Sequence, residues 1–168
     1  MKRLPLFLLA LVLLATAGCK PKGQDIPQIQ RKEAASLASE AQFAVMMRDH
    51  ARAEPLFEKA AKLCPDNGEY WIGLGVCRKR LGNVSGAKTA YEEAREAYRD
   101  AYDIDPKQSD ALLQEFYVMA LLGKVEEARK LQDKALKKNP TDARLRAFVE
   151  GKQLDNLIAD PGFKELSL

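Results

Sequence analysis

The chain has 168 residues, of which 46% are hydrophobic and 30% are charged, and this length and composition predict one folded domain. Its net charge is +3. Without Lys2 and Arg3, which lie in a segment that we expect to be removed, 25 basic residues face 24 acidic ones. Such a balance excludes a dedicated nucleic-acid binder, which needs a basic face. One histidine and three scattered cysteines exclude a His-rich metal site, a zinc cage and a disulfide-stapled scaffold.

The first 18 residues have the order of charge and hydrophobicity of a secretory signal peptide. Lys2 and Arg3 make the start positive, and the apolar run Leu4–Leu14 is followed by small residues. A membrane-spanning helix is the alternative, but the uncharged run is shorter than the ~20 residues that cross a bilayer. We therefore expect residues 1–18 to be a signal peptide.

Two cleavage motifs compete at the end of this segment. Ala15-Thr16-Ala17 has the A-x-A form that ordinary signal peptidase cuts. Thr16-Ala17-Gly18-Cys19 resembles the lipobox of bacterial lipoproteins, with Thr16 where that family usually has leucine. The resemblance implies cleavage before Cys19 and three acyl chains on this residue, which would hold the protein firmly on a membrane. A chance cysteine is the alternative, and it would leave an odd number of cysteines in an exported chain.

The residues that follow Cys19 bear on where the protein is held. By resemblance to lipoprotein sorting, Lys20 in place of aspartate implies the outer membrane, with the domain facing the periplasm. Residues 19–30 contain prolines, a glycine and few apolar residues, so we expect a flexible tether. Fully extended at ~3.3 Å per residue, the tether would span about 35 Å. The folded domain is then expected over residues 31–168.

A helical pattern without strand-like alternation runs through residues 31–168, and its small residues recur with a fixed period. The same spacing of alanine, a larger residue, alanine and proline occurs twice, at Ala53, Phe57, Ala60, Pro65 and at Ala128, Gln132, Ala135, Pro140. Between them the pattern starts at Ala87, Tyr91 and Ala94, and it finishes seven residues late at Tyr98, Ala101 and Pro106.

This pattern resembles the tetratricopeptide repeat, a helix–turn–helix unit of 34 residues. The resemblance implies an all-α fold, a short α-solenoid of three units at about residues 34–67, 68–108 and 109–142, with a C-terminal cap over 142–168. The second unit matches best, through Trp71, Leu74, Gly75, Gly82, Ala87 and Tyr91. The third unit has Phe116 where the family usually has a small residue.

The seven extra residues of the second unit are predicted to lengthen one helix. From Val84 to Ala101, small and aromatic residues step by three and four, which keeps them on one face. We therefore expect one continuous helix from about Val84 to Ile104 whose end overhangs the stack. The overhang is either a neutral elongation or a ledge with a role of its own.

The C-terminal segment is predicted to close the stack. Thr141-Asp142 can cap a helix over residues 142–158. Asp160-Pro161-Gly162 then predicts a turn, after which Phe163 and Leu166 should fold back onto the capping helix.

The sequence offers no catalytic constellation, so we expect neither enzyme activity nor a cofactor. His50, expected in the turn of the first unit, is the only histidine, and it leaves the serines without a credible Ser–His–Asp arrangement. Carboxylate pairs such as Glu92-Glu93 have Lys or Arg three or four residues away, as on an ordinary helix surface. Cys64 and Cys77 form no CxxC motif, and a disulfide between them remains open in an oxidising compartment.

The resemblance also implies a binding face, because in this family the first helix of each unit lines a concave groove for an extended or helical peptide. Carried over by repeat position, the groove residues are Gln42, Val45, Met46, Ile72, Val76, Lys79, Arg80, Leu113, Tyr117 and Leu121. An apolar strip edged by Lys79 and Arg80 would suit a peptide with an acidic side chain or a C-terminal carboxylate. Burial of this strip between the units is the alternative.

Together these resemblances imply a non-enzymatic, membrane-anchored interaction module of the bacterial cell envelope. Its partners would be a protein or peptide in the groove and the membrane through lipid on Cys19. Two other classes stay open. One is a structural envelope protein that forms homo-oligomers through the overhanging helix, and the other is a regulator or adaptor of an envelope enzyme such as a peptidoglycan hydrolase.

Overall fold

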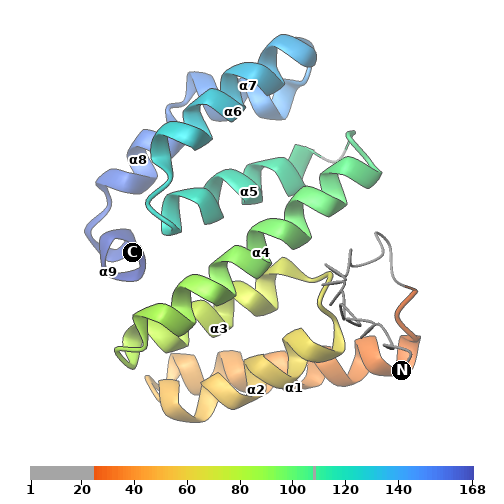
Figure 1. Cartoon of the computed structure of the whole chain (residues 1–168), viewed down its shortest axis with the longest axis vertical. Coiled ribbons are helices and arrows are strands. Elements are labelled where there is room, and N and C mark those ends of the chain that lie inside the picture. The colour runs from red at the N-terminus through yellow and green to blue at the C-terminus, as the bar shows by residue number, and fades with distance from the viewer. Residues whose placement is uncertain (1–24, 108) are drawn as a thin grey trace, which may run out of the picture.

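The computed structural model describes residues 25–107 and 109–168, and these residues form nine helices and no strand. The helices are α1 (Gln28–Met46), α2 (His50–Leu63), α3 (Gly68–Arg80), α4 (Val84–Ile104), α5 (Ser109–Leu121), α6 (Val125–Lys138), α7 (Ala143–Glu150), α8 (Gln153–Ala159) and α9 (Pro161–Leu166). The first six stack as three antiparallel pairs, and α7 to α9 follow at the far end (Figure 1). The predicted all-α solenoid is confirmed.

Short polar side chains and prolines set the limits of the helices. Five helices begin at a side chain that accepts a hydrogen bond from a backbone N–H in the first turn, at Asp49, Asn67, Asn83, Asp142 and Asp160. The second helix of each pair ends two residues before a proline, at Pro65, Pro106 and Pro140. The repeat pattern of the sequence therefore coincides with the ends of real helices.

The turns inside the three pairs share one left-handed residue. Gly82 and Gly123 have φ angles of 81° and 71°, a conformation that suits glycine. In the first pair Arg48 occupies the same place with a φ of 60°, although it is not glycine. The three turns lie along one edge of the stack (Figure 1).

The second pair packs most closely at a glycine. A Cβ added at Gly75 on α3 would overlap the ring of Tyr91 on α4, so this ring lies directly against the α3 backbone. Tyr91 is fully buried. The same relation holds between Gly68 and the ring of Tyr98, near the other end of the two helices. Large rings therefore fill the space that small residues leave.

The third pair is built differently because Phe116 takes the repeat position of Gly75. Its side chain is fully buried, and the facing aromatic position is held by Gln132, which is also buried. The α5 and α6 backbones approach each other at fewer places than those of the other pairs. The ring of Phe116 instead meets that of Phe148 on α7, with 5.7 Å between the centroids. This aromatic contact draws α7 onto α5.

Helix α4 runs unbroken from Val84 to Ile104, as its spacing predicts. Its last turns do not overhang freely, however. Tyr98 lies against Gly68, and the Tyr102 hydroxyl accepts a hydrogen bond of 3.2 Å from the Asn139 side chain. Only the end remains open, where Ile104 is 61% exposed.

Two sequence-based boundaries are wrong. α1 begins at Gln28, inside the range predicted for the tether, because Ile26 is buried against the core and Pro27 supplies the residue before the helix. The predicted helix over 142–158 is broken between α7 and α8 at Lys152, which takes a left-handed φ of 49°. The predicted signal peptide, Cys19 and most of the tether lie outside the described residues.

Asp160-Pro161-Gly162, expected as a turn, is the start of α9. The Asp160 carboxylate accepts a 2.8 Å hydrogen bond from the Phe163 N–H, and proline suits the first helical position because it has no N–H to satisfy. Phe163 and Leu166 fold back, as expected, but they reach beyond the cap. α9 packs against α8 and against α3.

Arginines join successive layers of the stack. The Arg78 Nε lies 3.0 Å from a Glu54 oxygen on α2, and the Arg95 Nε lies 3.3 Å from a Glu115 oxygen on α5. Arg129 on α6 reaches Asp155 on α8 at 2.6 Å. The buried Glu115 carboxylate thus lies beside a guanidinium, as a charge removed from water requires.

We expect Gly75→Ala to destabilise the fold by about 1–3 kcal/mol, since the added methyl group must displace the Tyr91 ring from a closely packed core. Chemical denaturation monitored by circular dichroism measures the free energy of unfolding. The control is Lys88→Ala on the exposed side of α4, which should leave that free energy within about 0.5 kcal/mol of the original. Equal stability of the two variants would contradict the role of this contact.

Candidate peptide-binding groove

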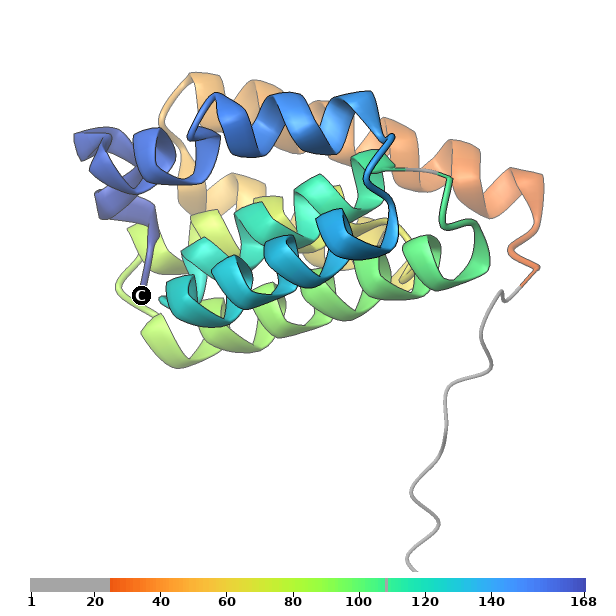
Figure 2. The same cartoon turned by 90° about the horizontal axis from the view of Figure 1, so that it is seen from above.

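The first helices of the three pairs, α1, α3 and α5, lie on one side of the stack. The C-terminal helices bend back over this side: α7 and α8 contact α5, and α9 contacts α3. Figure 2 shows α7 to α9 on the side that α1 occupies, away from α4. The face predicted to bind a peptide is therefore covered in part by the chain's own end.

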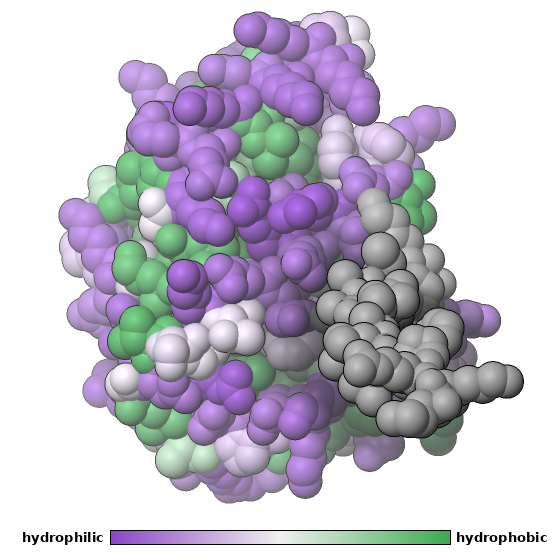
Figure 3. All heavy atoms as spheres, viewed as in Figure 1, coloured by the Kyte–Doolittle hydropathy of each residue, from purple (hydrophilic) through white to green (hydrophobic). Residues whose placement is uncertain are grey.

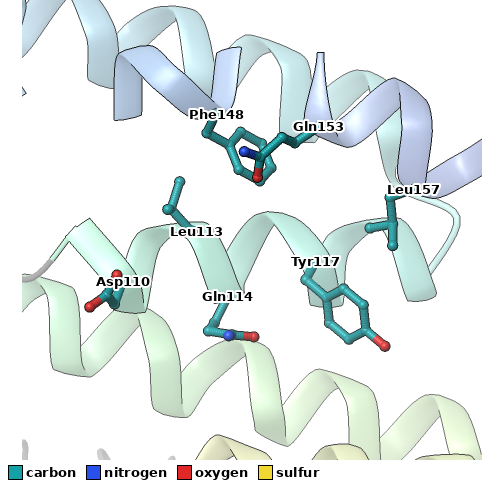
Figure 4. A pocket seen from close by; sticks show the side chains of 7 residues that line it. All are labelled: Asp110, Leu113, Gln114, Tyr117, Phe148, Gln153 and Leu157. Carbon is teal, nitrogen blue, oxygen red and sulfur yellow. The ribbon is translucent and has the colours of Figure 1, made fainter. Parts of the chain in front are cut away.

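A cleft of about 370 Å³, here the α5 cleft, separates α5 from α7 and α8. In Figure 4, Phe148, Gln153 and Leu157 point from the C-terminal helices toward α5, and Leu113 points back at them. Asp110, Gln114 and Tyr117 complete the wall on α5. The lining mixes apolar side chains with amide groups and the Asp110 carboxylate, which suits a peptide with apolar side chains and a polar main chain.

A second cleft, of about 450 Å³, lies where α3 and α5 begin and has an acidic lining. Asp66, Glu69 and Asp110 line it, and Arg31 is held by Asp66 at 2.7 Å. The Tyr98 hydroxyl beside it is buried and has no hydrogen-bond partner among the described residues. Burial raises the pKa of this hydroxyl, so it stays protonated and can donate. We call this the acidic cleft.

A third cleft, of about 490 Å³, lies where α1 and α3 end and is basic. Arg48, His50 and Arg80 line it together with Val45 and Val76. His50 is the first residue of α2 rather than part of the turn, and its buried Nδ1 has no hydrogen-bond partner in the described chain. Two residues of the C-terminal segment, Glu165 and Leu166, also reach this cleft. We call it the basic cleft.

The C-terminal tail, residues 161–168, makes side-chain contacts with the predicted groove. Arg80 Nη1 lies 2.6 Å from a Glu165 oxygen, an ion pair between an exposed carboxylate and a half-exposed guanidinium. Phe163 is buried and meets Tyr117 edge to face, with 5.6 Å between the ring centroids. An acidic and an aromatic side chain therefore occupy the groove.

Two hydrogen bonds fix the main chain of the tail. The Tyr91 hydroxyl donates to the Leu166 carbonyl at 3.0 Å, and the Leu168 N–H donates to the Leu121 carbonyl at 2.8 Å. Tyr91 belongs to α4, and its ring passes the α3 backbone at Gly75 before its hydroxyl meets the tail. Burial raises the pKa of this hydroxyl well above its usual range, so it remains a donor.

The structure divides the ten predicted groove residues into three groups. The first group lines the basic cleft or the α5 cleft and consists of Val45, Val76, Arg80, Leu113 and Tyr117. Ile72 and Lys79 are half-buried on α3, with Ile72 packed against the core. The remaining three do not line these clefts, since Leu121 is fully buried and Gln42 and Met46 are exposed elsewhere on α1.

Met46 belongs instead to an apolar edge formed by the turns. It is 74% exposed, and Met47, Leu81 and Val84 are exposed at the same turns. Figure 3 shows apolar side chains among polar ones along this edge, at the left of the view. The turn edge is thus a second surface, distinct from the groove.

Sequence reasoning missed the groove residues that come from the C-terminal helices. Phe148, Gln153 and Leu157 line the α5 cleft, and Glu165 enters the basic cleft. A signal for the tail was present, because aspartate followed by proline is typical of a helix start and Phe163 and Leu166 are three residues apart. No comparable signal identifies the surface on which that helix packs.

The chemistry of the described residues suits binding. No group of three His, Cys, Asp or Glu side chains gathers there in a way that could hold a metal ion. Cys64 and Cys77 are both free thiols in the core, so no disulfide joins them. Burial raises the pKa of Cys77 to about 11, with Glu54 adding to the effect, and burial also raises the pKa of Cys64. None of the helices in this part of the chain is long and apolar enough to span a bilayer.

Comparison with known families agrees with the paired helices. Two family models described as tetratricopeptide repeat match the chain, one over residues 39–109 and one over residues 89–150. It is a tetratricopeptide-repeat protein. Proteins with this repeat are in general non-catalytic interaction modules that bind other proteins. No curated protein matches the chain.

We expect the two core thiols of this repeat protein to react slowly with Ellman's reagent at pH 8. With a pKa of about 11, Cys77 has on the order of 100-fold less thiolate at this pH than a thiol with a pKa of 9. Reactivity should appear as the pH rises toward 11, or at once in denaturant. Rapid labelling of both thiols in the folded chain at pH 8 would contradict the buried placement.

Proposed function

We propose that this tetratricopeptide-repeat protein is a membrane-anchored interaction module of the bacterial cell envelope, which holds a helical or extended segment of a partner protein in its groove. The observation that carries the proposal is the bound tail, because a short helix with an aromatic and an acidic side chain already fits this face. Helix-in-groove binding of this kind places apolar anchors at i, i+3 and i+4.

The charges along the groove favour one orientation of the partner. The acidic cleft lies where α3 and α5 begin, and the basic cleft lies where α1 and α3 end. A segment with a carboxylate toward Arg80 and a basic or neutral part toward Glu69 would meet complementary charges at both ends. Such complementarity acts mainly on specificity and on the rate of association.

Membrane attachment in this proposal comes from the lipobox-like residues that end at Cys19. Each buried methylene group contributes ~0.8 kcal/mol, so several acyl chains on one residue give lasting attachment. Because α1 begins at Gln28, the tether between lipid and domain is shorter than the sequence alone predicts. The domain would work close to the membrane surface, in the periplasm if the outer membrane is the site.

Self-association is a second candidate, and the apolar turn edge favours it. Met46, Met47, Leu81 and Val84 are exposed there, and Ile104 is exposed at the end of α4. A second copy could cover either surface. Sedimentation of the chain without its signal separates this candidate from the first, because a stable dimer favours a structural role.

We expect Cys19→Ser to release the protein from the membrane fraction, since this change removes the sulfur that would carry the lipid. Fractionation and immunoblotting of cells that express the full chain measure the distribution. Cys64→Ser, at a buried position of the folded domain, is the control and should stay with the membrane. If the Cys19 variant also stays, lipid anchoring at this residue is wrong.

We expect Gln114→Arg to abolish partner capture, because Gln114 is an exposed side chain that lines both the α5 cleft and the acidic cleft. A long cation there fills the groove without disturbing the core. Pull-down from membranes followed by mass spectrometry compares this variant with Lys134→Glu, an exposed position on α6. A partner lost from the first variant and kept by the second supports groove binding, and equal capture by both contradicts it.

A further inference from the structure

The C-terminal tail occupies the groove in the manner of a ligand. Three of its contact residues, Arg80, Tyr117 and Leu121, are at positions where the family's repeat pattern places peptide contacts. Tyr91, on α4, contributes a fourth contact through the hydrogen bond that its hydroxyl donates to the Leu166 carbonyl. The tail therefore shows directly which side chains this surface accepts.

The contacts separate into a part that depends on sequence and a part that does not. Phe163 meets Tyr117 and Glu165 meets Arg80, so the groove selects an aromatic residue and a carboxylate two positions later. Leu166 adds an aliphatic side chain beside the basic cleft. The bonds from Tyr91 and to Leu121 involve the main chain of the tail, which any peptide can supply.

The tail is held weakly enough to be displaced. α9 has six residues, too few for an isolated helix to be stable in water, and Asp160 alone joins it to α8. Glu165 is 62% exposed, so solvent screens its ion pair with Arg80. Phe163 is the single buried side chain of the tail. None of these contacts lies between the two helices of a pair, although Phe163 belongs to the same core cluster as Tyr91 and Phe116.

From these contacts we infer that the tail is an internal competitor for the groove, and that the partner segment that displaces it carries the same pattern: an aromatic residue, a carboxylate two positions later and an aliphatic residue after that. The inference rests on the proposed groove function and adds both its specificity and its regulation. With the tail in place, the Tyr91 hydroxyl donates its hydrogen bond to the Leu166 carbonyl. A partner segment that displaces the tail must supply a carbonyl group at the same position.

The size of the competition follows from the short connection. A segment tethered by one residue acts at an effective concentration of about 1 mM. If the free segment binds the groove with a Kd of about 0.1 mM, the tail occupies the groove in about ten of every eleven molecules. The apparent Kd of a competitor then rises about tenfold. Removing the tail should therefore increase the affinity for a competing segment by that factor.

The test uses a fluorescent peptide of residues 160–168 and fluorescence anisotropy. The chain that starts at Lys20 keeps every buried residue of the described part, which begins at Ile26. We expect this chain cut after Asp160 to bind the peptide, and the uncut chain to bind it about tenfold more weakly. Equal affinity for the two chains, or no binding to the cut chain while it remains helical by circular dichroism, overturns the inference.

A full-length variant covers the case in which the cut chain fails to fold. Phe163→Ala with Glu165→Lys keeps the length of the chain and removes both side-chain contacts of the tail, so this variant should bind the wild-type peptide about tenfold more tightly than the original chain does. Affinity equal to that of the original chain overturns the inference.

Peptide variants test the pattern itself. Phe163→Ala and Glu165→Lys in the peptide should each weaken binding at least about fivefold, whereas Lys164→Ala, at an exposed position, should not. The peptide with Glu165→Lys should regain affinity for a cut chain with Arg80→Glu. If none of these substitutions changes the affinity of the peptide, the proposed pattern is wrong.

Failure of this inference is distinguishable from failure of the proposed function. If the peptide does not bind but partner capture is lost with Gln114→Arg, the groove function remains and the tail is not a competitor. If the peptide binds as expected but the Gln114→Arg variant captures the partner as well as the original chain does, the proposed function fails. A dimer in sedimentation that dissociates on removal of the tail would place the tail in the groove of a second copy and overturn the intramolecular assignment.

Discussion

The arrangement of this molecule depends on one close contact, between the ring of Tyr91 and the backbone of α3 at Gly75. The missing side chain at Gly75 lets α3 and α4 approach, and this fixes the second pair at the centre of the stack. Because Gly75 has no side chain, the Tyr91 ring can also extend past α3, so that its hydroxyl reaches the Leu166 carbonyl. A packing requirement of the repeat and a contact of the groove are therefore met by one side chain.

The third pair departs from this plan, and the departure explains the path of the C-terminal helices. Phe116 replaces the glycine, Gln132 replaces the ring, and the backbones of α5 and α6 approach less closely. The ring of Phe148, from α7, then packs against the ring of Phe116 and helps to bury it. Because α7 is only eight residues long and ends at Glu150, just before Gly151 and the left-handed Lys152, the chain turns back early and leads α8 and α9 onto the groove.

The sequence was sufficient to predict the repeated helix pairs, but it was insufficient to predict the path of the C-terminal helices that cover the groove. Alanine, glycine and proline in one frame define helix ends and close contacts, and these are local properties, so the three pairs and the unbroken α4 follow from them. The break at Lys152 rests on a left-handed conformation that lysine seldom adopts, and no pattern announces it. The tail's position depends on Tyr117 and Arg80, which precede their partners Phe163 and Glu165 by 46 and 85 residues.

The direction of α1 has a consequence for access. Gln28 and Met46 are at opposite ends of a helix roughly 28 Å long, and the turns, the basic cleft and the tail all lie near the Met46 end. The described part of the chain therefore begins at one end of the domain, and Glu165 lies at the other. A partner that approaches the Met46 end of α1 reaches the basic cleft and the ion pair between Glu165 and Arg80 before it reaches the start of α1.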